Sequence, residues 1–94
     1  IMSGIPQINI NQLPPEVQTT INLISIGGPY PHSKDGIVFK NFEGLLPPQP
    51  RGYYKEYTVP TPGATDRGSR RLVMGQNGEI YYSCDHYNSF QEVI

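Results

Sequence analysis

Three segments in the second half of the chain carry the side chains that phosphodiester cleavage requires. Glu56 offers a carboxylate, residues 67–71 offer the run Arg-Gly-Ser-Arg-Arg, and His86 offers an imidazole beside Asp85. A carboxylate can act as a general base and an imidazole as a general acid, while guanidinium groups bind phosphate oxygens. These groups suffice in kind for RNA transesterification, in which the ribose 2′-hydroxyl attacks its own phosphate. Because the nucleophile belongs to the substrate, we expect no metal and no cofactor.

The charge of the chain is unevenly distributed. The 94 residues carry a formal net charge of −1, so the protein has no overall basic signature of a nucleic-acid binder. Between Arg51 and Arg71, however, five basic residues outnumber two acidic ones, and residues 79–94 contain three acidic residues and no Lys or Arg. A basic patch on a neutral body fits a protein that contacts a few phosphates rather than a long duplex.

Composition excludes several other classes of protein. Cys84 is the only cysteine, so the chain forms no internal disulfide. His32 and His86 lack zinc-ligand spacing with each other and with that cysteine, and we predict no metal site. No apolar run approaches the ~20 residues that span a bilayer, and no signal peptide is visible. The start at Ile1 indicates a mature fragment or a domain cut from a longer polypeptide.

The N-terminal third predicts one amphipathic helix of about three turns. Pro14 and Pro15 stand where a helix can begin, with Glu16 in the first turn. Apolar residues then recur at helical spacing, at Val17, Ile21, Leu23 and Ile24. The run 27–29, Gly-Gly-Pro, ends the helix.

The rest of the chain predicts β-strands. Runs rich in β-branched and aromatic residues occupy positions 37–39, 53–59, 71–74 and 79–83. Turn residues separate them, and 76–78, Gln-Asn-Gly, is typical of a tight hairpin. Because the strands are consecutive and their connections are loops, we expect an antiparallel sheet with the helix covering one face. The fold class is therefore α+β, in a single domain spanning residues 1–94.

Strand alternation places the chemical groups on one face of this sheet. Leu72 and Met74 belong to the face that meets the helix, so Arg71 points to the other face. Glu56 can share that face if the two strands are neighbours, and His86, in a loop after the last predicted strand, can reach its end. Each residue also has a structural explanation, as a solvated strand glutamate, an exposed basic turn or a loop histidine. Spacing alone therefore indicates a nucleic-acid site and nothing more specific.

Four longer segments carry a resemblance. Residues 35–41, residues 52–59, residues 61–63 with 67–71, and residues 81–82 with 85–87 closely resemble the small guanyl-specific microbial ribonucleases. The similarity is strongest to the secreted enzymes of streptomycetes, with barnase and binase as cousins. It runs in register from about Leu13 to Phe90. The resemblance implies a metal-independent endoribonuclease that cleaves single-stranded RNA 3′ to guanosine.

The resemblance also implies a role for individual residues. Glu56 matches the general base that takes the 2′-hydroxyl proton, and His86 matches the general acid that protonates the leaving 5′-oxygen. Arg67 and Arg71 match the arginines that bind the phosphate. The product would be a guanosine 2′,3′-cyclic phosphate, which the same pair hydrolyses more slowly with exchanged roles.

A second group of residues matches the base-recognition site of that family. The recognition loop comprises Phe39, Lys40, Asn41, Phe42 and Glu43. Its main-chain N–H groups would meet guanine O6 and N7, and the Glu43 carboxylate would accept from N1–H and the exocyclic amine. Adenine lacks that pair of donors, so it would leave Glu43 unpaired. Phe39 and Tyr87 are expected to flank or stack on the base.

The chain departs from the family pattern at three points. Phe42 stands where relatives commonly have arginine, and Lys40 stands where they have glutamine or serine, so Lys40 replaces part of a lost charge. Lys55 replaces a residue that is often histidine, and we expect it on the opposite face from Glu56. Cys84 has no partner for the disulfide that ties the ends of streptomycete relatives.

The resemblance further implies where and with what the protein acts. We expect a secreted monomer that binds single-stranded RNA, does not bind membranes, and is paired with an acidic barstar-like inhibitor. The inhibitor would plug a positive cleft formed by basic residues, namely Arg67, Arg70 and Arg71, with Lys40 and Lys55 nearby. Two alternatives are the C-terminal toxin domain of a larger secreted protein and a non-catalytic RNA-binding relative. Retention of Glu56 and His86 argues against the second, because binding alone needs neither a base nor an acid.

Overall fold

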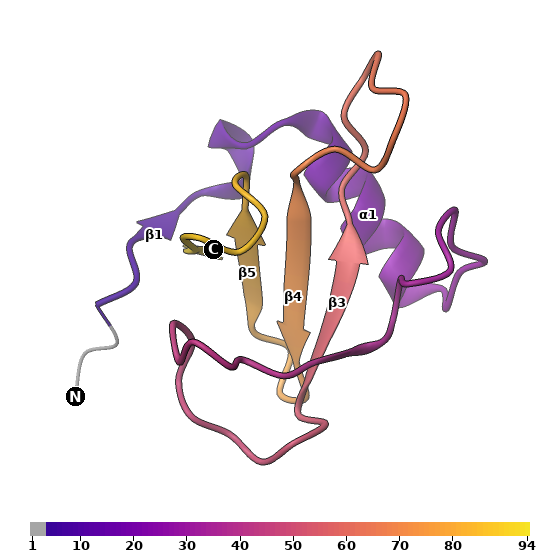
Figure 1. Ribbon diagram of the computed structural model, residues 1–94. Coiled ribbons are helices and arrows are strands. Elements are labelled where there is room, and N and C mark those ends of the chain that lie inside the picture. Colours follow the sequence, from indigo (N-terminus) through magenta and orange to yellow (C-terminus); the bar gives the residue numbers. More distant parts are fainter. Residues whose placement is uncertain (1–3) are drawn as a thin grey trace.

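The computed structural model describes residues 4–94, which form an α-helix packed against a six-stranded sheet (Figure 1). The predicted chain start at Ile1 lies outside the described residues. The elements in chain order are β1 (Gln7–Ile8), the 3₁₀ helix η1 (Ile10–Gln12), α1 (Pro15–Ser25), β2 (Val38–Phe39), β3 (Tyr54–Thr58), β4 (Arg71–Gly75), β5 (Ile80–Ser83) and β6 (Gln91–Val93).

Helix α1 begins and ends at the residues that the sequence predicts. Pro15 occupies the first turn with Glu16, where the missing proline N–H costs nothing and a carboxylate meets the positive end of the helix dipole. At the C-terminus, the Gly28 N–H bonds to Leu23 O at 3.1 Å and the Gly27 N–H bonds to Ile24 O at 3.1 Å, which is a Schellman motif. Gly27 has φ +80°, a conformation that glycine adopts without a Cβ clash. No helix in residues 4–94 is long and apolar enough to cross a membrane.

The sheet has the order β1-β6-β5-β4-β3-β2. Strands β2 to β5 pair antiparallel in consecutive order, as predicted, and the β4–β5 hairpin turns through residues 76–78. Strand β6 adds a further antiparallel pair with β5. Strands β1 and β6 were not predicted, and they form a parallel pair that joins the two ends of the chain. Both are only two or three residues long, so their pattern in the sequence is too short to indicate a strand. The prediction of a wholly antiparallel sheet was therefore wrong at this edge.

Each face of the sheet is packed differently. On one face, Val17 of α1 packs with Tyr57, Leu72 and Tyr82 of the strands. On the other, a loop of residues 40–53 crosses the lower ends of the strands on the side opposite α1 (Figure 1). This second face buries a separate apolar cluster, which consists of Leu46, Tyr53, Tyr54, Val73, Tyr81 and Phe90. The face away from α1 is therefore covered at the lower ends of the strands rather than left open to solvent there.

Tyr53 also differs from its prediction. It precedes β3 rather than belonging to it, and its ring lies edge-on to Tyr54 at 5.0 Å. Its hydroxyl donates a hydrogen bond of 2.5 Å to Glu79 Oε2 across the mouth of the β4–β5 hairpin. Tyr53 therefore belongs to the second cluster rather than to the helix-facing side.

Candidate active site

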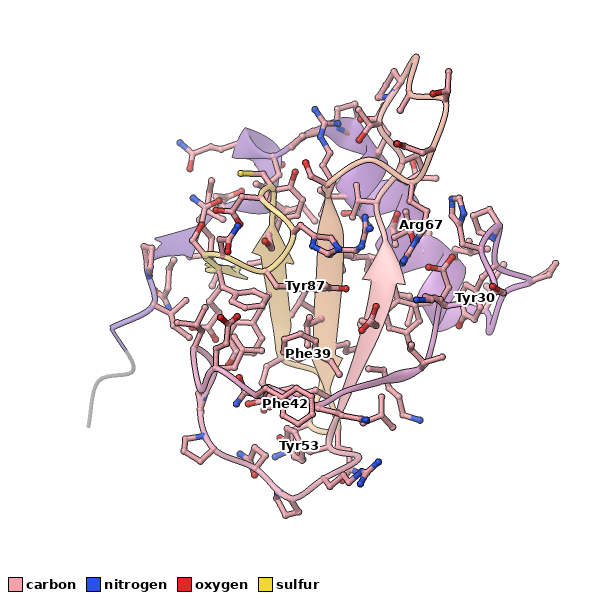
Figure 2. All side chains as sticks on the ribbon, viewed as in Figure 1. Tyr30, Phe39, Phe42, Tyr53, Arg67 and Tyr87 are labelled. Atoms are coloured by element: carbon pink, nitrogen blue, oxygen red, sulfur yellow. The ribbon has the colours of Figure 1, made fainter. Side chains whose placement is uncertain are left out.

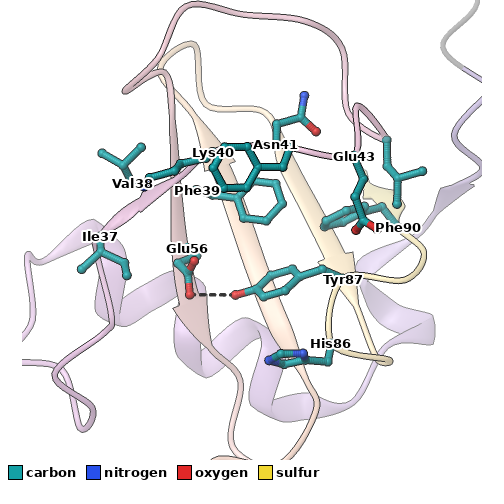
Figure 3. A pocket seen from close by; sticks show the side chains of 12 residues that line it. Ile37, Val38, Phe39, Lys40, Asn41, Glu43, Glu56, His86, Tyr87 and Phe90 are labelled. Atoms are coloured by element: carbon teal, nitrogen blue, oxygen red, sulfur yellow. Dashed lines mark hydrogen bonds between the residues drawn. The ribbon is translucent and has the colours of Figure 1, made fainter.

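Glu56 and Arg71 lie on the same face of the sheet, away from α1, as strand alternation predicts. In the β3–β4 pairing, Glu56 is opposite Val73 and Thr58 is opposite Arg71, so the two side chains are diagonal neighbours. The Glu56 side chain is 14% exposed. Its Oε1 accepts a hydrogen bond of 2.8 Å from the Tyr87 hydroxyl (Figure 3). The same oxygen lies 4.0 Å from Nη2 of Arg67.

Arg67 is held in place by residues that the sequence did not identify as part of the site. Its Nε and Nη2 donate to Thr58 Oγ1 at 2.9 and 2.8 Å. Its Nη2 also lies 4.0 Å from Oδ1 of Asp35, whose side chain is only 2% exposed. The Asp35 carboxylate accepts from the Thr58 N–H at 2.7 Å and from the His32 N–H at 3.2 Å. The run Asp35-Gly36 is typical of a turn. Nothing local in the sequence indicates that this aspartate is buried beside Arg67.

Arg71 is a buried cation that has no carboxylate partner among residues 4–94. The residue is 3% exposed. Its Nη1 donates to two main-chain carbonyls, Gly68 O at 3.1 Å and Arg70 O at 2.8 Å, while its Nε has no hydrogen-bond partner in the described chain. Among residues 4–94, the ion pairs of arginine involve Arg67 and Arg70 only. An uncompensated buried charge costs several kcal/mol, so Arg71 is suited to receive an anion.

The loop that presents Arg71 depends on one glycine. Gly68 has φ +67°, and a Cβ there would lie 2.6 Å from Thr61 Oγ1. A side chain at position 68 would therefore collide with Thr61 and displace the chain around Gly68. The Gly68 carbonyl, which accepts a hydrogen bond from Arg71, would move with it.

His86 lies in the loop after β5, as predicted, although β6 rather than β5 is the last strand. His86 and Tyr87 both have positive φ, of +54° and +74°. Two successive non-glycine residues in this region are costly and are typical of functional sites. The His86 N–H bonds to Ser69 O at 2.9 Å, and the Tyr87 N–H bonds to Ser83 Oγ at 2.9 Å. These bonds hold the strained segment in place.

Asp85, next to His86, supports the loop and does not face the chemistry. Its carboxylate accepts hydrogen bonds from Ser89 and Ser83, at 2.6 and 2.8 Å from the two hydroxyl groups. The bond from Ser89 is the largest cause of the lowered pKa of Asp85. The ionised carboxylate therefore ties the two ends of the turn that carries His86.

Tyr87 connects the Glu56 carboxylate to the predicted base site. Its ring centroid lies 4.9 Å from that of Phe39 and 5.2 Å from that of His86. Burial raises the pKa of Tyr87 most, the hydrogen bond to Glu56 raises it further, and Arg71 and Arg67 partly oppose the shift. The phenol therefore stays protonated and remains a donor toward Glu56. The sequence predicted the stacking role of Tyr87 but not this hydrogen bond.

The recognition loop is closed by its own asparagine. Asn41 has φ +55°, and its side-chain amide bonds to both the O and the N–H of Leu46, at 3.0 and 3.1 Å. The Gly44 N–H also bonds to Asn41 O at 3.0 Å. The Asn41 side chain is thus used inside the protein and fixes the shape of the loop.

A pocket of about 430 Å³ joins the predicted recognition loop to the predicted general base and acid. All six predicted base-binding residues line it, together with Glu56 and His86 (Figure 3). Its volume lies in the range of small-ligand sites, roughly 300–1,000 Å³. Arg67 and Arg71 are not part of the lining, and they flank Glu56 on the sheet. The structure thus brings the predicted base-binding residues together with the predicted general base and acid.

Two predicted members of a positive cleft lie elsewhere. Nη1 of Arg70 is 3.7 Å from Oε1 of Glu16 on α1, which places Arg70 on the helix-facing side. Lys55 alternates with Glu56 along β3 and is exposed on that same side, where the sequence predicted it. Arg70 was predicted in the cleft, but it precedes Arg71 in the chain, so its side chain points to the opposite face of the sheet. The positive charge at the site therefore comes from fewer residues than predicted: Arg67 and Lys40, which solvent reaches, and Arg71, which is buried.

Comparisons with known proteins find similar proteins over nearly the whole chain. A sequence model of the ribonuclease family matches residues 2–94. Guanyl-specific ribonuclease St of Saccharopolyspora erythraea is 53% identical over 92 residues, which span 98% of this chain and 91% of the relative. A solved structure of ribonuclease Sa2 complexes with mononucleotides has a TM-score of 0.94 at 48% identity, and covers 97% of this chain and 95% of that one. Another, of ribonuclease Sa2 with guanosine-2′-cyclophosphate, has a TM-score of 0.92 at 48% identity and covers 97% of both chains. The predicted α+β fold is confirmed by these structures.

Proposed function

Because the chain belongs to the ribonuclease family, we propose that it is a guanyl-specific endoribonuclease that cleaves single-stranded RNA on the 3′ side of guanosine. The guanyl-specific relative and the guanosine-2′-cyclophosphate complex of ribonuclease Sa2 support both the base preference and a cyclic phosphate product. The observation that carries the proposal is that Glu56, His86 and the recognition loop all line one pocket.

The first step is a transesterification within the RNA. The Glu56 carboxylate removes the proton from the 2′-hydroxyl, and the 2′-oxygen forms a bond to phosphorus. The bond between phosphorus and the 5′-oxygen of the next nucleotide breaks, and His86 donates a proton to that oxygen. In the second step His86 deprotonates a water, the water opens the cyclic phosphate, and Glu56 returns its proton to the 2′-oxygen.

The arginines stabilise the charge that develops on the phosphate. Arg71 supplies a desolvated guanidinium whose charge has no carboxylate partner in the described chain, and its Nε is free of protein partners there. Arg67 is held beside Glu56 by Thr58 and Asp35. Preorganised donors in a buried site stabilise a transition state more than they do in water, because they need no reorganisation during the reaction.

Guanine selection is assigned to the recognition loop. Glu43 lines the pocket and is exposed, so its carboxylate can accept from guanine N1–H and the exocyclic amine. Phe39 and Tyr87 both line the pocket and contact each other, with ring centroids 4.9 Å apart, so a base can stack against this pair but not between the two rings. Phe42 and Lys40 interact with each other at the rim, with Nζ 5.5 Å from the ring centroid, and take the place of the arginine that relatives carry.

The proposal is tested by digesting a mixed-sequence RNA in EDTA and mapping the new ends. We expect cuts after guanosine, with 2′,3′-cyclic phosphate ends that convert slowly to 3′-phosphates. The variant Glu56→Gln is the matched control for contaminating nuclease. Cuts without base preference, or cleavage that the variant preparation reproduces, would contradict the proposal.

We further propose that the enzyme is a secreted monomer and that an acidic barstar-like inhibitor blocks its pocket. The resemblance to secreted guanyl-specific ribonucleases supports secretion, whether as a free enzyme or as the toxin domain of a longer protein. Arg67 and Lys40 at the site support electrostatic pairing with an acidic partner. Inhibition should be competitive with RNA, and a steady-state inhibition pattern that is not competitive would contradict it.

A further inference from the structure

A second hollow, of about 340 Å³, lies against the recognition loop. It lies outside the pocket of about 430 Å³ that is proposed to bind guanine, which is called the guanine pocket below. The segment 39–42 lines both spaces, so it forms the wall between them. No acidic side chain lines the second hollow, whereas Lys40 and Arg51 do. The guanine pocket, in contrast, includes Glu43 and Glu56. The second hollow is therefore a positively charged space next to the site that binds the substrate.

Phe42 stands at the border of the two spaces and is not used by the fold. It is 87% exposed, more than any other large apolar residue described (Figure 2). Its described interaction is with the Lys40 ammonium group at 5.5 Å, and it belongs to neither apolar cluster. A fully exposed aromatic ring beside cations offers a platform on which a nucleobase can stack, while the cations attract the adjoining phosphates.

The wall that carries Arg51 is held in a defined shape. The Tyr54 hydroxyl donates to Pro47 O at 2.7 Å, and the Tyr53 N–H bonds to Pro50 O at 3.1 Å around a turn in which Gly52 has φ +90°. Arg51 is exposed at this turn. It has no ion pair with any residue in the described range 4–94, so its charge is available to a ligand.

We propose that this second hollow binds the nucleotide on the 5′ side of the guanosine, with its base on Phe42 and its phosphate near Lys40 and Arg51. The inference rests on the proposed function. The direction follows from the chemistry, because the 3′ nucleotide departs with the oxygen that His86 protonates. The second hollow is lined by neither His86 nor Glu56, and the recognition loop separates it from both. The protein therefore binds one nucleotide upstream of the guanosine.

The test compares kcat/KM for three oligonucleotides: GpC, the upstream-extended ApGpC, and the downstream-extended GpCpA. For the wild type, we expect the upstream nucleotide to raise kcat/KM by about fivefold or more, the lower end of what one stacked base contributes. Arg51→Gln should remove about half or more of that gain. It should leave GpC cleavage unchanged, because Arg51 does not line the pocket that contains Glu56 and His86. Phe42→Ala should abolish the gain relative to its own rate on GpC, and Phe42→Tyr should retain it.

The matched control is Lys55→Gln, which removes an equal charge from the helix-facing side and should leave all three substrates unchanged. Failure of the wild type to cleave GpC would refute the proposed function itself. Normal GpC cleavage with an upstream gain that is equal in wild type, Arg51→Gln and Phe42→Ala would refute only the second subsite. The variants Arg51→Gln and Phe42→Ala could instead lose a rate gain on GpCpA and keep the gain on ApGpC. That result would show that the hollow takes the downstream nucleotide, and it would overturn the direction proposed here.

Discussion

The Tyr87 hydroxyl donates a hydrogen bond of 2.8 Å to Oε1 of Glu56, across 31 positions of the chain. This bond links the loop after β5 to the middle of β3, and it joins a ring that packs on Phe39 to the Glu56 carboxylate. The same oxygen of Glu56 lies 4.0 Å from Arg67. The residues proposed for base stacking, proton removal and phosphate binding therefore meet at one carboxylate.

Replacing Glu56 or His86 by glutamine should lower kcat for GpC by about 10²–10⁴-fold each, the usual contribution of a general base or acid. Both groups are on the surface of the pocket, so circular dichroism should show an unchanged fold. Steady-state kinetics of the purified variants provide the measurement. A variant with near wild-type turnover would show that its residue has another role.

Tyr87→Phe should lower kcat for GpC by about two- to tenfold, the equivalent of one net hydrogen bond of about 0.5–1.5 kcal/mol. The substitution keeps the ring beside Phe39 and removes the Tyr87 hydroxyl that donates to Oε1 of Glu56, so the carboxylate loses a group that holds it in place. Steady-state kinetics of the purified variant on GpC provide the measurement. Turnover equal to that of the wild type would mean that this hydrogen bond does not position the carboxylate.

Thr58→Val should lower kcat by about tenfold with little change in KM, if Arg67 acts mainly in the transition state. Valine has nearly the volume of threonine, but it removes the oxygen that holds both Nε and Nη2 of Arg67. The variant Thr19→Val is a suitable control, because Thr19 is exposed on α1 and its hydroxyl is bonded only within the helix. Equal kinetics for the two variants would argue against a positioning role for Thr58.

Glu43→Ala should weaken the preference for guanine more than it slows cleavage of other RNA. The carboxylate is the acceptor for two guanine donors, and such a pair is worth about 1–3 kcal/mol of discrimination, or roughly 5- to 150-fold. The ratio of kcat/KM for GpC and ApC measures it. An unchanged ratio would move the origin of specificity to the main chain of the recognition loop.

The free energy of unfolding should fall as the pH rises above about 10. Burial raises the pKa of Tyr54 from 10.0 to about 12, and burial also raises the pKa of Tyr57 and Tyr81. Between the unfolded and the folded pKa, the unfolded chain has released protons that the folded chain keeps, so stability present below pH 10 is lost as the pH rises. Urea unfolding at pH 9 and pH 11 measures the change.

Tyr54→Phe is the matched variant for that measurement. It should be less stable at pH 9, because the bond to Pro47 O is lost, and should show a shallower decline between pH 9 and pH 11. A decline as steep as that of the wild type would exclude Tyr54 as a source of the alkaline sensitivity.

The sequence by itself determined which groups share a face and where the helix lies. A β-strand alternates strictly, so Arg71 had to face away from Leu72 and Met74, and the register of β3 with β4 places Glu56 beside it. The same rule applied to Arg70 would have excluded it from the site. Residues 27–28 end α1 because a glycine takes up the left-handed conformation that the Schellman motif requires, and such a glycine is visible in the local sequence.

Tertiary structure alone decided the contacts between distant segments. The bonds of Tyr87 to Glu56 and of Thr58 to Arg67 depend on how loops cross the sheet, and loop paths follow from packing rather than from a local pattern. Asp35 became a buried acceptor because the chain before β2 folds back onto β3. The parallel pairing of β1 with β6 requires both chain ends to meet, and strands of two or three residues carry no periodic signal of their own.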